Sequence, residues 1–233
     1  MMKKILSKIL DLVLGTKDTA ETATTEDGAP PPPKKQPKGV TLEQILGAAA
    51  MEAPKEPDLR VIGLYSDVND EKIAELTQAL LYLSELNRLR PPKQEAKPIE
   101  FYINTYGGSA DDMFALYDVM QIVKEETEIH TIGVGKVMSA GTLLLAAGTK
   151  GKRKVGKNCR VMIHNVAAGN FGTLPNLANE LEAIQQLQDD YISAMVEHTK
   201  FTRKKLEKLL NEKVNIYLDA EEAVKYGLAD EIM

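Results

Sequence analysis

The chain has 233 residues, of which 43% are hydrophobic and 27% charged, a balance typical of a protein that buries a substantial core. Its formal charge of −5 disfavours binding to a phosphate backbone, so we expect no nucleic-acid partner. One cysteine, three histidines and the lack of a long apolar run disfavour a disulfide, a metal centre and a membrane span. We expect no cofactor, no metal and a cytoplasmic location.

Proline is unevenly distributed along the chain. Seven of the 11 prolines fall in the first quarter of the sequence. Residues 1–15 predict an amphipathic helix, residues 16–38 a flexible linker with a polyproline segment, and Thr41 the cap of a second short helix. We therefore predict a flexible N-terminal extension over residues 1–58 and a compact domain over residues 59–233.

Short β-rich runs alternate with longer helical patterns in the rest of the chain, which is typical of an α/β layered fold. The longest helix is expected over residues 175–199, where apolar residues keep the helical period. Asp219 and Glu222 predict a capping box for the last helix. Strands are predicted at residues 61–64, 99–104, 129–134 and 160–163, and other helices at residues 70–87, 110–126, 141–147 and after Thr202.

Two glycine- and serine-containing turns have the residue types that acyl transfer needs. Gly107 and Gly108 follow a strand, and glycines let peptide N–H groups approach a bound carbonyl closely. Ser139 lies between an apolar strand and a helix of small residues, which suits either a helix N-cap or a nucleophile. Val137 replaces the first glycine of a Gly-x-Ser-x-Gly motif, so an α/β-hydrolase elbow is disfavoured.

His164 ends an apolar strand 25 residues after Ser139. A histidine in such a place is more often a surface or hydrogen-bonded residue, and we interpret His130 and His198 in that way. His164 differs because, together with the serine and the Gly-Gly turn, it completes a set of nucleophile, base and oxyanion donors. Lys136 is the less favoured base, since it lies only three residues before the serine.

From about residue 60 to the end, the chain resembles the ClpP family, the proteolytic subunits of the Clp protease. The resemblance runs in order through RVIGLYSDVND, FYINTYGG, ALYDVM, GKVMSAGTLLLAAG, VMIHN and AEEAVKYGLADEI. It implies an α/β, ClpP/crotonase-like fold of repeated β-β-α units with a protruding handle helix at residues 175–199. It also implies a serine endopeptidase in which Ser139 is the nucleophile and His164 the general base.

The resemblance implies the remaining site residues as well. Gly108 and Ala140 would donate the N–H groups of the oxyanion hole. The third catalytic position, usually Asp in the family, is Asn215 here, which can accept the histidine N–H but adds no charge to stabilise imidazolium. The alternative is therefore a non-catalytic or impaired subunit with a structural or assembly role. An acyl-CoA-handling crotonase relative is disfavoured, because it leaves the serine–histidine pairing unexplained.

Partners follow from the same resemblance. Family members form stacked rings around a chamber, into which a hexameric ATPase threads unfolded polypeptide. We therefore expect a homo-oligomer, unfolded polypeptide substrates and, because this sequence has no Walker motif, a separate AAA+ ATPase. Two features depart from the family: the loop over residues 90–97 is longer than usual, and the extension replaces the short segment that lines the axial pore.

Overall fold

The computed structural model describes residues 58–212 and 214–233. The amphipathic helix, the linker and the second short helix expected before residue 58 lie outside the described residues, so the division into extension and domain stays a prediction. Within the described ranges, no helix is both long enough and apolar enough to cross a membrane.

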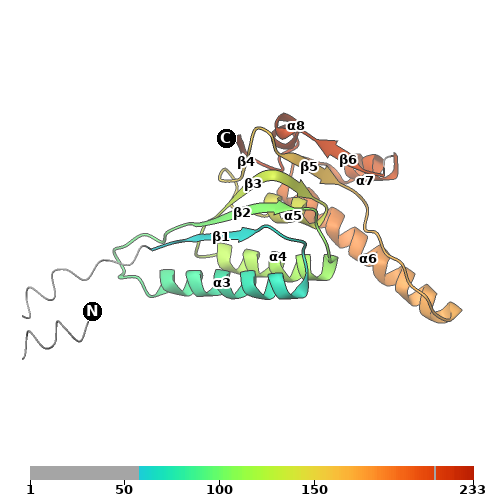
Figure 1. Cartoon of the computed structure of the whole chain (residues 1–233), viewed down its shortest axis with the longest axis horizontal. Helices are drawn as coiled ribbons and strands as arrows, with labels where there is room; N and C mark the ends of the chain where they lie inside the picture. Colours follow the sequence, from blue (N-terminus) through green and yellow to red (C-terminus); the bar gives the residue numbers. More distant parts are fainter. Residues whose placement is uncertain (1–57, 213) are drawn as a thin grey trace, which may run out of the picture. The chain divides into compact units, whose positions relative to one another are not determined.

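A seven-stranded, mostly parallel sheet lies at the centre of the domain (Figure 1). Four neighbouring strands run parallel, in the order β1, β2, β3 and β5, and β6 then pairs antiparallel with β5. The short strands β4 and β7 continue the sheet from another part of β3. The strands are β1 (Val61–Leu64), β2 (Ile99–Thr105), β3 (Ile129–Met138), β4 (Lys154–Val155), β5 (Arg160–Ile163), β6 (Ile216–Leu218) and β7 (Glu231–Ile232).

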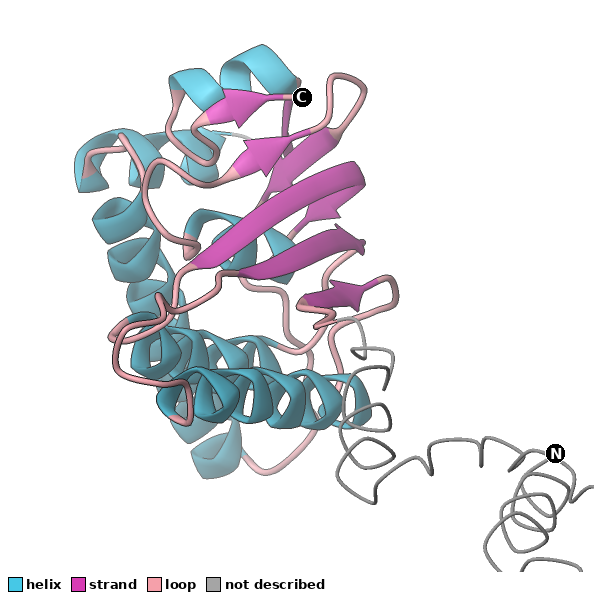
Figure 2. Ribbon diagram, turned by 90° about the vertical axis from the view of Figure 1, so that its left-hand side faces the viewer, coloured by secondary structure: helices cyan, strands magenta, loops and turns pink. Residues whose placement is uncertain are grey.

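Most helices lie together on one side of the strands (Figure 2). Helices packed on a mostly parallel sheet confirm the α/β class. The longest helix, α6, extends away from the body of the domain (Figure 1), as the protruding helix was expected to do. Its first turns are exposed, and only its C-terminal part reaches the core. The helices are α3 (Asp70–Arg88), α4 (Ala110–Lys124), α5 (Ala140–Ala146), α6 (Leu174–His198), α7 (Arg203–Glu212) and α8 (Ala220–Lys225).

Local sequence explains where α3 and α8 form. Apolar residues of α3 recur at helical spacing and are buried, and the side chain of Asn69 caps the helix by accepting from the N–H of Lys72. The capping box predicted for the last helix is confirmed, since Asp219 accepts from the Glu222 N–H while the Glu222 side chain accepts from the Asp219 N–H. Gly227 follows α8 with φ +77°, a conformation that favours glycine.

Strand β3 is longer than expected: it continues to Met138 rather than ending near residue 134. Between its pairings at Gly133 and Val137 the register against β2 shifts, and Gly135 takes φ +65° at that irregularity. The sequence predicted a strand end near residue 134, but the extra residues are absorbed as a bulge and pairing resumes. The strand therefore reaches the serine that follows Met138.

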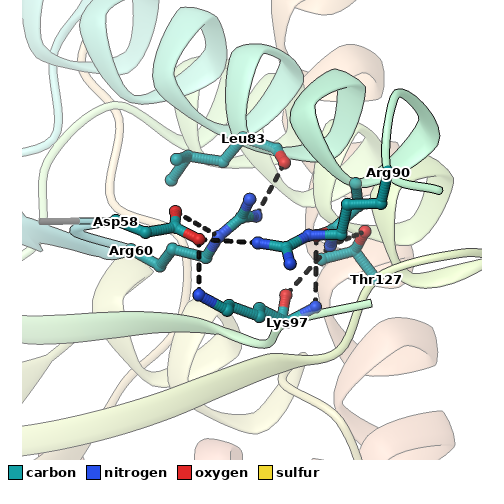
Figure 3. Close-up of polar contacts among 7 residues, drawn as sticks. Asp58, Arg60, Leu83, Arg90, Lys97 and Thr127 are labelled. Atoms are coloured by element: carbon teal, nitrogen blue, oxygen red, sulfur yellow. Dashed lines mark hydrogen bonds and ion pairs between the residues drawn. The ribbon is translucent and has the colours of Figure 1, made fainter. Parts of the chain in front are cut away.

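Asp58 ties the beginning of the described domain to the end of α3 and the following loop (Figure 3). Its carboxylate accepts from Arg60 Nε at 2.9 Å and from Arg90 Nη2 and Lys97 Nζ at 2.6 Å each. Arg60 also donates to the carbonyl of Leu83 at 3.0 Å. These hydrogen bonds lower the pKa of Asp58 from 3.8 to about 2, and the bond from Lys97 has the largest effect. The ionised carboxylate thus favours folding above about pH 4, and the gain is lost as the pH falls through about 2.

Candidate active site

The carboxyl ends of three neighbouring parallel strands meet at one edge of the sheet. Gly108 follows β2, Ser139 follows β3 and His164 follows β5. The register between the last two strands pairs Met138 with Met162, so Ser139, one residue further on, and His164, two residues further on, come close together. In open α/β sheets this edge is where ligands bind. The topology therefore brings the Gly-Gly turn, the serine and the histidine to one place.

The side chains of Ser139 and His164 are in direct contact: Ser139 Oγ lies 2.7 Å from His164 Nε2. Ser139 also stands at the N-cap position of α5, but its side chain makes no capping hydrogen bond. The hydroxyl is therefore committed to the imidazole rather than to the helix end. When the hydroxyl donates to Nε2, the neutral imidazole carries its proton on Nδ1.

The backbone at Ser139 is held in a costly conformation. With φ +54° and ψ −122°, Ser139 is the one non-glycine residue with positive φ in the described ranges. Such a conformation persists only where the surroundings impose it, and it is concentrated at functional sites. The Ser139 N–H donates to the carbonyl of Met162 at 2.8 Å, which fixes one side of the residue against β5. The sharp turn carries the hydroxyl beyond the sheet edge.

The two glycines are required by close packing. A Cβ at Gly107 would lie 2.5 Å from the Cβ of Ser139, and a Cβ at Gly108 would lie 2.1 Å from the carbonyl oxygen of Val68. Their φ values of +103° and +151° also fall in the region that side chains disfavour. A glycine pair here lets the backbone approach Ser139 closely.

Two residues with free backbone N–H groups lie beside Ser139 and His164. Gly108 and Ala140 both line the same cavity, of about 200 Å³, together with Ser139 and His164. Ala140 is the first residue of α5, so its N–H has no acceptor within the helix. In the described part of the chain, neither N–H group has a backbone acceptor. The rest of the wall is mainly apolar and includes Ala110, Met113, Val166, Ala167 and Tyr191.

Asn215 is the one predicted catalytic residue that makes no hydrogen bond to its expected partner among the described residues. Strands β5 and β6 pair Ile163 with Ile216, so continuing this register by one residue places Asn215 opposite His164. Its side chain is exposed, however, and no hydrogen bond joins it to His164 among the described residues. Because β6 begins at Ile216, the strand pairing does not hold the preceding residue in place.

The other candidates from the sequence have structural partners. Lys136 donates to Asn104 Oδ1 at 3.0 Å and stacks over the ring of Tyr106, so it offers no base to the serine. His198 is buried beside Tyr117, whose hydroxyl lies 2.9 Å from its Nε2, and burial lowers the His198 pKa to about 4. His130 pairs with Glu128 at 2.7 Å. The described residues hold no group of three or more histidine, cysteine or acidic side chains suited to a metal ion.

Comparison with known proteins points to one family. The Clp protease family model matches residues 57–233. Among curated proteins, the ATP-dependent Clp protease proteolytic subunit of Deinococcus radiodurans is 35% identical over 174 residues, which are 75% of this chain and 80% of the relative. The family match thus spans every residue named in the candidate site.

Proposed function

Because the chain belongs to the Clp protease family and is a serine peptidase, we propose that Ser139 and His164 hydrolyse peptide bonds through an acyl-enzyme intermediate. The observation that carries this assignment is the 2.7 Å contact between Ser139 Oγ and His164 Nε2 at a strained turn. A serine in hydrogen-bond reach of a base is the arrangement that nucleophilic catalysis needs.

Each step has a residue suited to it. His164 Nε2 takes the proton of Ser139 as Oγ attacks the scissile carbonyl, and the N–H groups of Gly108 and Ala140 stabilise the resulting oxyanion. The protonated imidazole then gives its proton to the leaving amine, so the C–N bond breaks and an acyl-serine remains. Water, deprotonated by the same imidazole, releases the acyl group and restores the hydroxyl.

An impaired or assembly-only subunit is the second candidate, and Asn215 is the observation that favours it. A triad needs a third group that accepts the Nδ1–H of histidine and fixes its tautomer. Asn215 lies opposite His164 by strand register but makes no hydrogen bond to it within the described ranges. Retention of the Ser139–His164 contact and of the glycine pair favours the catalytic function.

We also propose that the chain assembles as a homo-oligomer of stacked rings in the cytoplasm and degrades unfolded polypeptides delivered by a separate AAA+ ATPase. The name of the Deinococcus relative, a proteolytic subunit of an ATP-dependent protease, supports this. The exposed apolar residues Leu174, Leu177 and Leu181 on α6 support assembly, because a second subunit would remove them from water. Native mass spectrometry of the full chain measures the number of subunits.

A fluorophosphonate probe tests the catalytic proposal. We expect the probe to phosphonylate Ser139 of the assembled full chain, with peptide mapping locating the adduct on that residue and Ser139→Ala remaining unlabelled. Labelling requires an activated hydroxyl and an oxyanion site, which an assembly-only subunit lacks. An unlabelled protein of confirmed oligomeric mass would rule out catalysis by Ser139 and favour the structural role.

Replacing Asn215 by aspartate is expected to retain or raise kcat for peptide hydrolysis. A carboxylate opposite His164 would accept its Nδ1–H and stabilise imidazolium, and the reverse change in a serine protease triad costs about 10⁴-fold, which sets the upper bound of the gain. Asn179→Asp, on exposed α6, controls for added charge. A large loss of kcat in Asn215→Asp alone would show that the amide itself is needed.

A further inference from the structure

The carbonyl of Ser139 is held by two hydrogen bonds from one residue. Thr142 donates its backbone N–H to this oxygen at 2.9 Å and its hydroxyl Oγ1–H to the same oxygen at 2.6 Å. The threonine is fully buried in the first turn of α5, so water does not compete for either bond. The carbonyl of the strained residue therefore has little freedom to rotate.

Tyr191 supports this threonine from another element. Its hydroxyl lies 2.8 Å from Thr142 Oγ1. The hydroxyl of Thr142 has one hydrogen, and a carbonyl only accepts, so the tyrosine must be the donor in this pair. Burial raises the pKa of Tyr191 to about 12, and the phenol therefore keeps its proton at working pH. A chain of donors thus runs from Tyr191 on α6 through Thr142 to the Ser139 carbonyl.

The same peptide plane carries the N–H of Ala140. In a trans peptide the C=O of one residue and the N–H of the next point in opposite directions, so fixing the Ser139 carbonyl also fixes the Ala140 N–H. Ala140 itself lines the cavity that also holds Ser139 and His164. A preorganised donor contributes to catalysis only if it already points at the place where the negative charge develops.

We propose that Thr142 and Tyr191 are positioning residues that aim the Ala140 N–H at the oxyanion by holding the carbonyl of Ser139. The proposal rests on the proposed function above. It assigns a role to the C-terminal part of α6, which joins the protruding half of that helix to the nucleophile turn. Tyr191 lines the cavity, but its hydroxyl is bonded to Thr142 Oγ1, so both side chains act through one peptide group.

Thr142→Val tests the first link, because it removes the hydroxyl and keeps the shape and the backbone N–H. We expect kcat for a fluorogenic peptide to fall about 10- to 100-fold with KM nearly unchanged. This loss of kcat should not exceed the loss caused by deleting an oxyanion donor outright. Thr142→Ser keeps the hydroxyl and is expected to stay within about threefold of the parent chain.

Tyr191→Phe tests the second link and is expected to lower kcat by about 3- to 10-fold. Since the phenol acts only through Thr142, the double variant should be no slower than Thr142→Val alone. Tyr117→Phe, which removes a hydroxyl that contacts His198 instead, is the matched control and should keep kcat. Thermal unfolding of each variant identifies any that lose activity by unfolding.

The affinity of a peptide aldehyde separates positioning from a merely structural role. The aldehyde forms a hemiacetal with the serine, and its oxygen occupies the oxyanion hole. Its Ki should rise by the same factor as kcat/KM falls across the variants, while KM for the peptide stays constant. If the parent chain is active but Thr142→Val leaves kcat and Ki unchanged, the positioning role is overturned while the proposed function still stands. A parent chain that neither cleaves the peptide nor binds the aldehyde would overturn the proposed function and the inference with it.

Discussion

Ser139→Ala is expected to lower kcat for peptide hydrolysis by at least about 10⁴-fold, as the loss of a nucleophile does in serine proteases. The hydroxyl oxygen that attacks the carbonyl is the atom deleted, and no other hydroxyl shares its 2.7 Å contact with His164 in the described ranges. His164→Ala should cost a similar factor. The double variant should be little slower than either single one, because nucleophile and base act as a unit.

Folding should survive the loss of this hydroxyl. The side chain of Ser139 contacts His164 and makes no capping bond, while its backbone bonds to Met162 and Thr142 do not depend on Oγ. Ser66→Ala removes an exposed hydroxyl and should leave kcat unchanged. If Ser139→Ala kept more than a tenth of the parent kcat in a preparation free of contaminating proteases, the serine would not be the nucleophile.

Asp230→Asn is expected to lower the free energy of unfolding by about 3 kcal/mol, because it leaves a buried guanidinium without its counter-charge. Arg153 is only 5% exposed, and it donates Nη2 to Asp230 Oδ1 at 2.6 Å and Nε to Oδ2 at 2.8 Å. The backbone N–H groups of Gly151 and Arg153 also donate to Oδ2. The arginine in turn binds the carbonyls of Ala146 and His198, so the cluster joins the ends of α5 and α6.

The same cluster predicts an acid dependence of stability. Burial alone would raise the pKa of Asp230, but the hydrogen bonds from Arg153 and Gly151 outweigh burial and lower it below 3.8. A carboxylate with a lowered folded-state pKa favours folding above its unfolded pKa and loses that contribution as the pH falls below it. The difference in unfolding free energy between the parent chain and Asp230→Asn should therefore shrink below about pH 4.

Urea unfolding at neutral and acidic pH measures both effects. Glu85→Gln is the matched control, because its exposed pair with Arg88 contributes less than about 0.5 kcal/mol. If Asp230→Asn and Glu85→Gln unfolded at the same urea concentration at pH 7, the Arg153 pair would not stabilise the fold.

Most of the fold could be predicted because the spacing of apolar residues within one segment indicates whether that segment forms a helix or a strand. The strands at 61–64 and 160–163 and the long helix near 175–199 are confirmed, since each combines the right period with recognisable ends. The extension of β3 beyond residue 134 was not predicted, because the glycine at position 135 weakens the strand pattern. Only pairing with β2 on one side and β5 on the other makes continuation through a bulge favourable.

Some features of the site could likewise be predicted from the sequence and others could not. Ser139, His164 and Gly108 could be placed together from motif order, because each follows a strand of one parallel sheet. The positive φ of Ser139 had no sequence signal, since serine also suits a helix cap. Tyr191 kept the apolar period of its helix, so nothing local distinguished it from a core residue. Its hydrogen bond to Thr142 spans 49 positions and is created only by tertiary packing.

A peptidyl chloromethyl ketone tests most directly whether Ser139 and His164 act on one substrate carbonyl. The serine adds to the ketone, and the imidazole then displaces chloride, so Nε2 becomes alkylated and HCl is lost. We expect mass spectrometry to find His164 alkylated in the parent chain, and the rate of alkylation to fall at least about 100-fold in Ser139→Ala. Alkylation of His164 at the same rate in both proteins, or of neither, would contradict a catalytic serine–histidine pair.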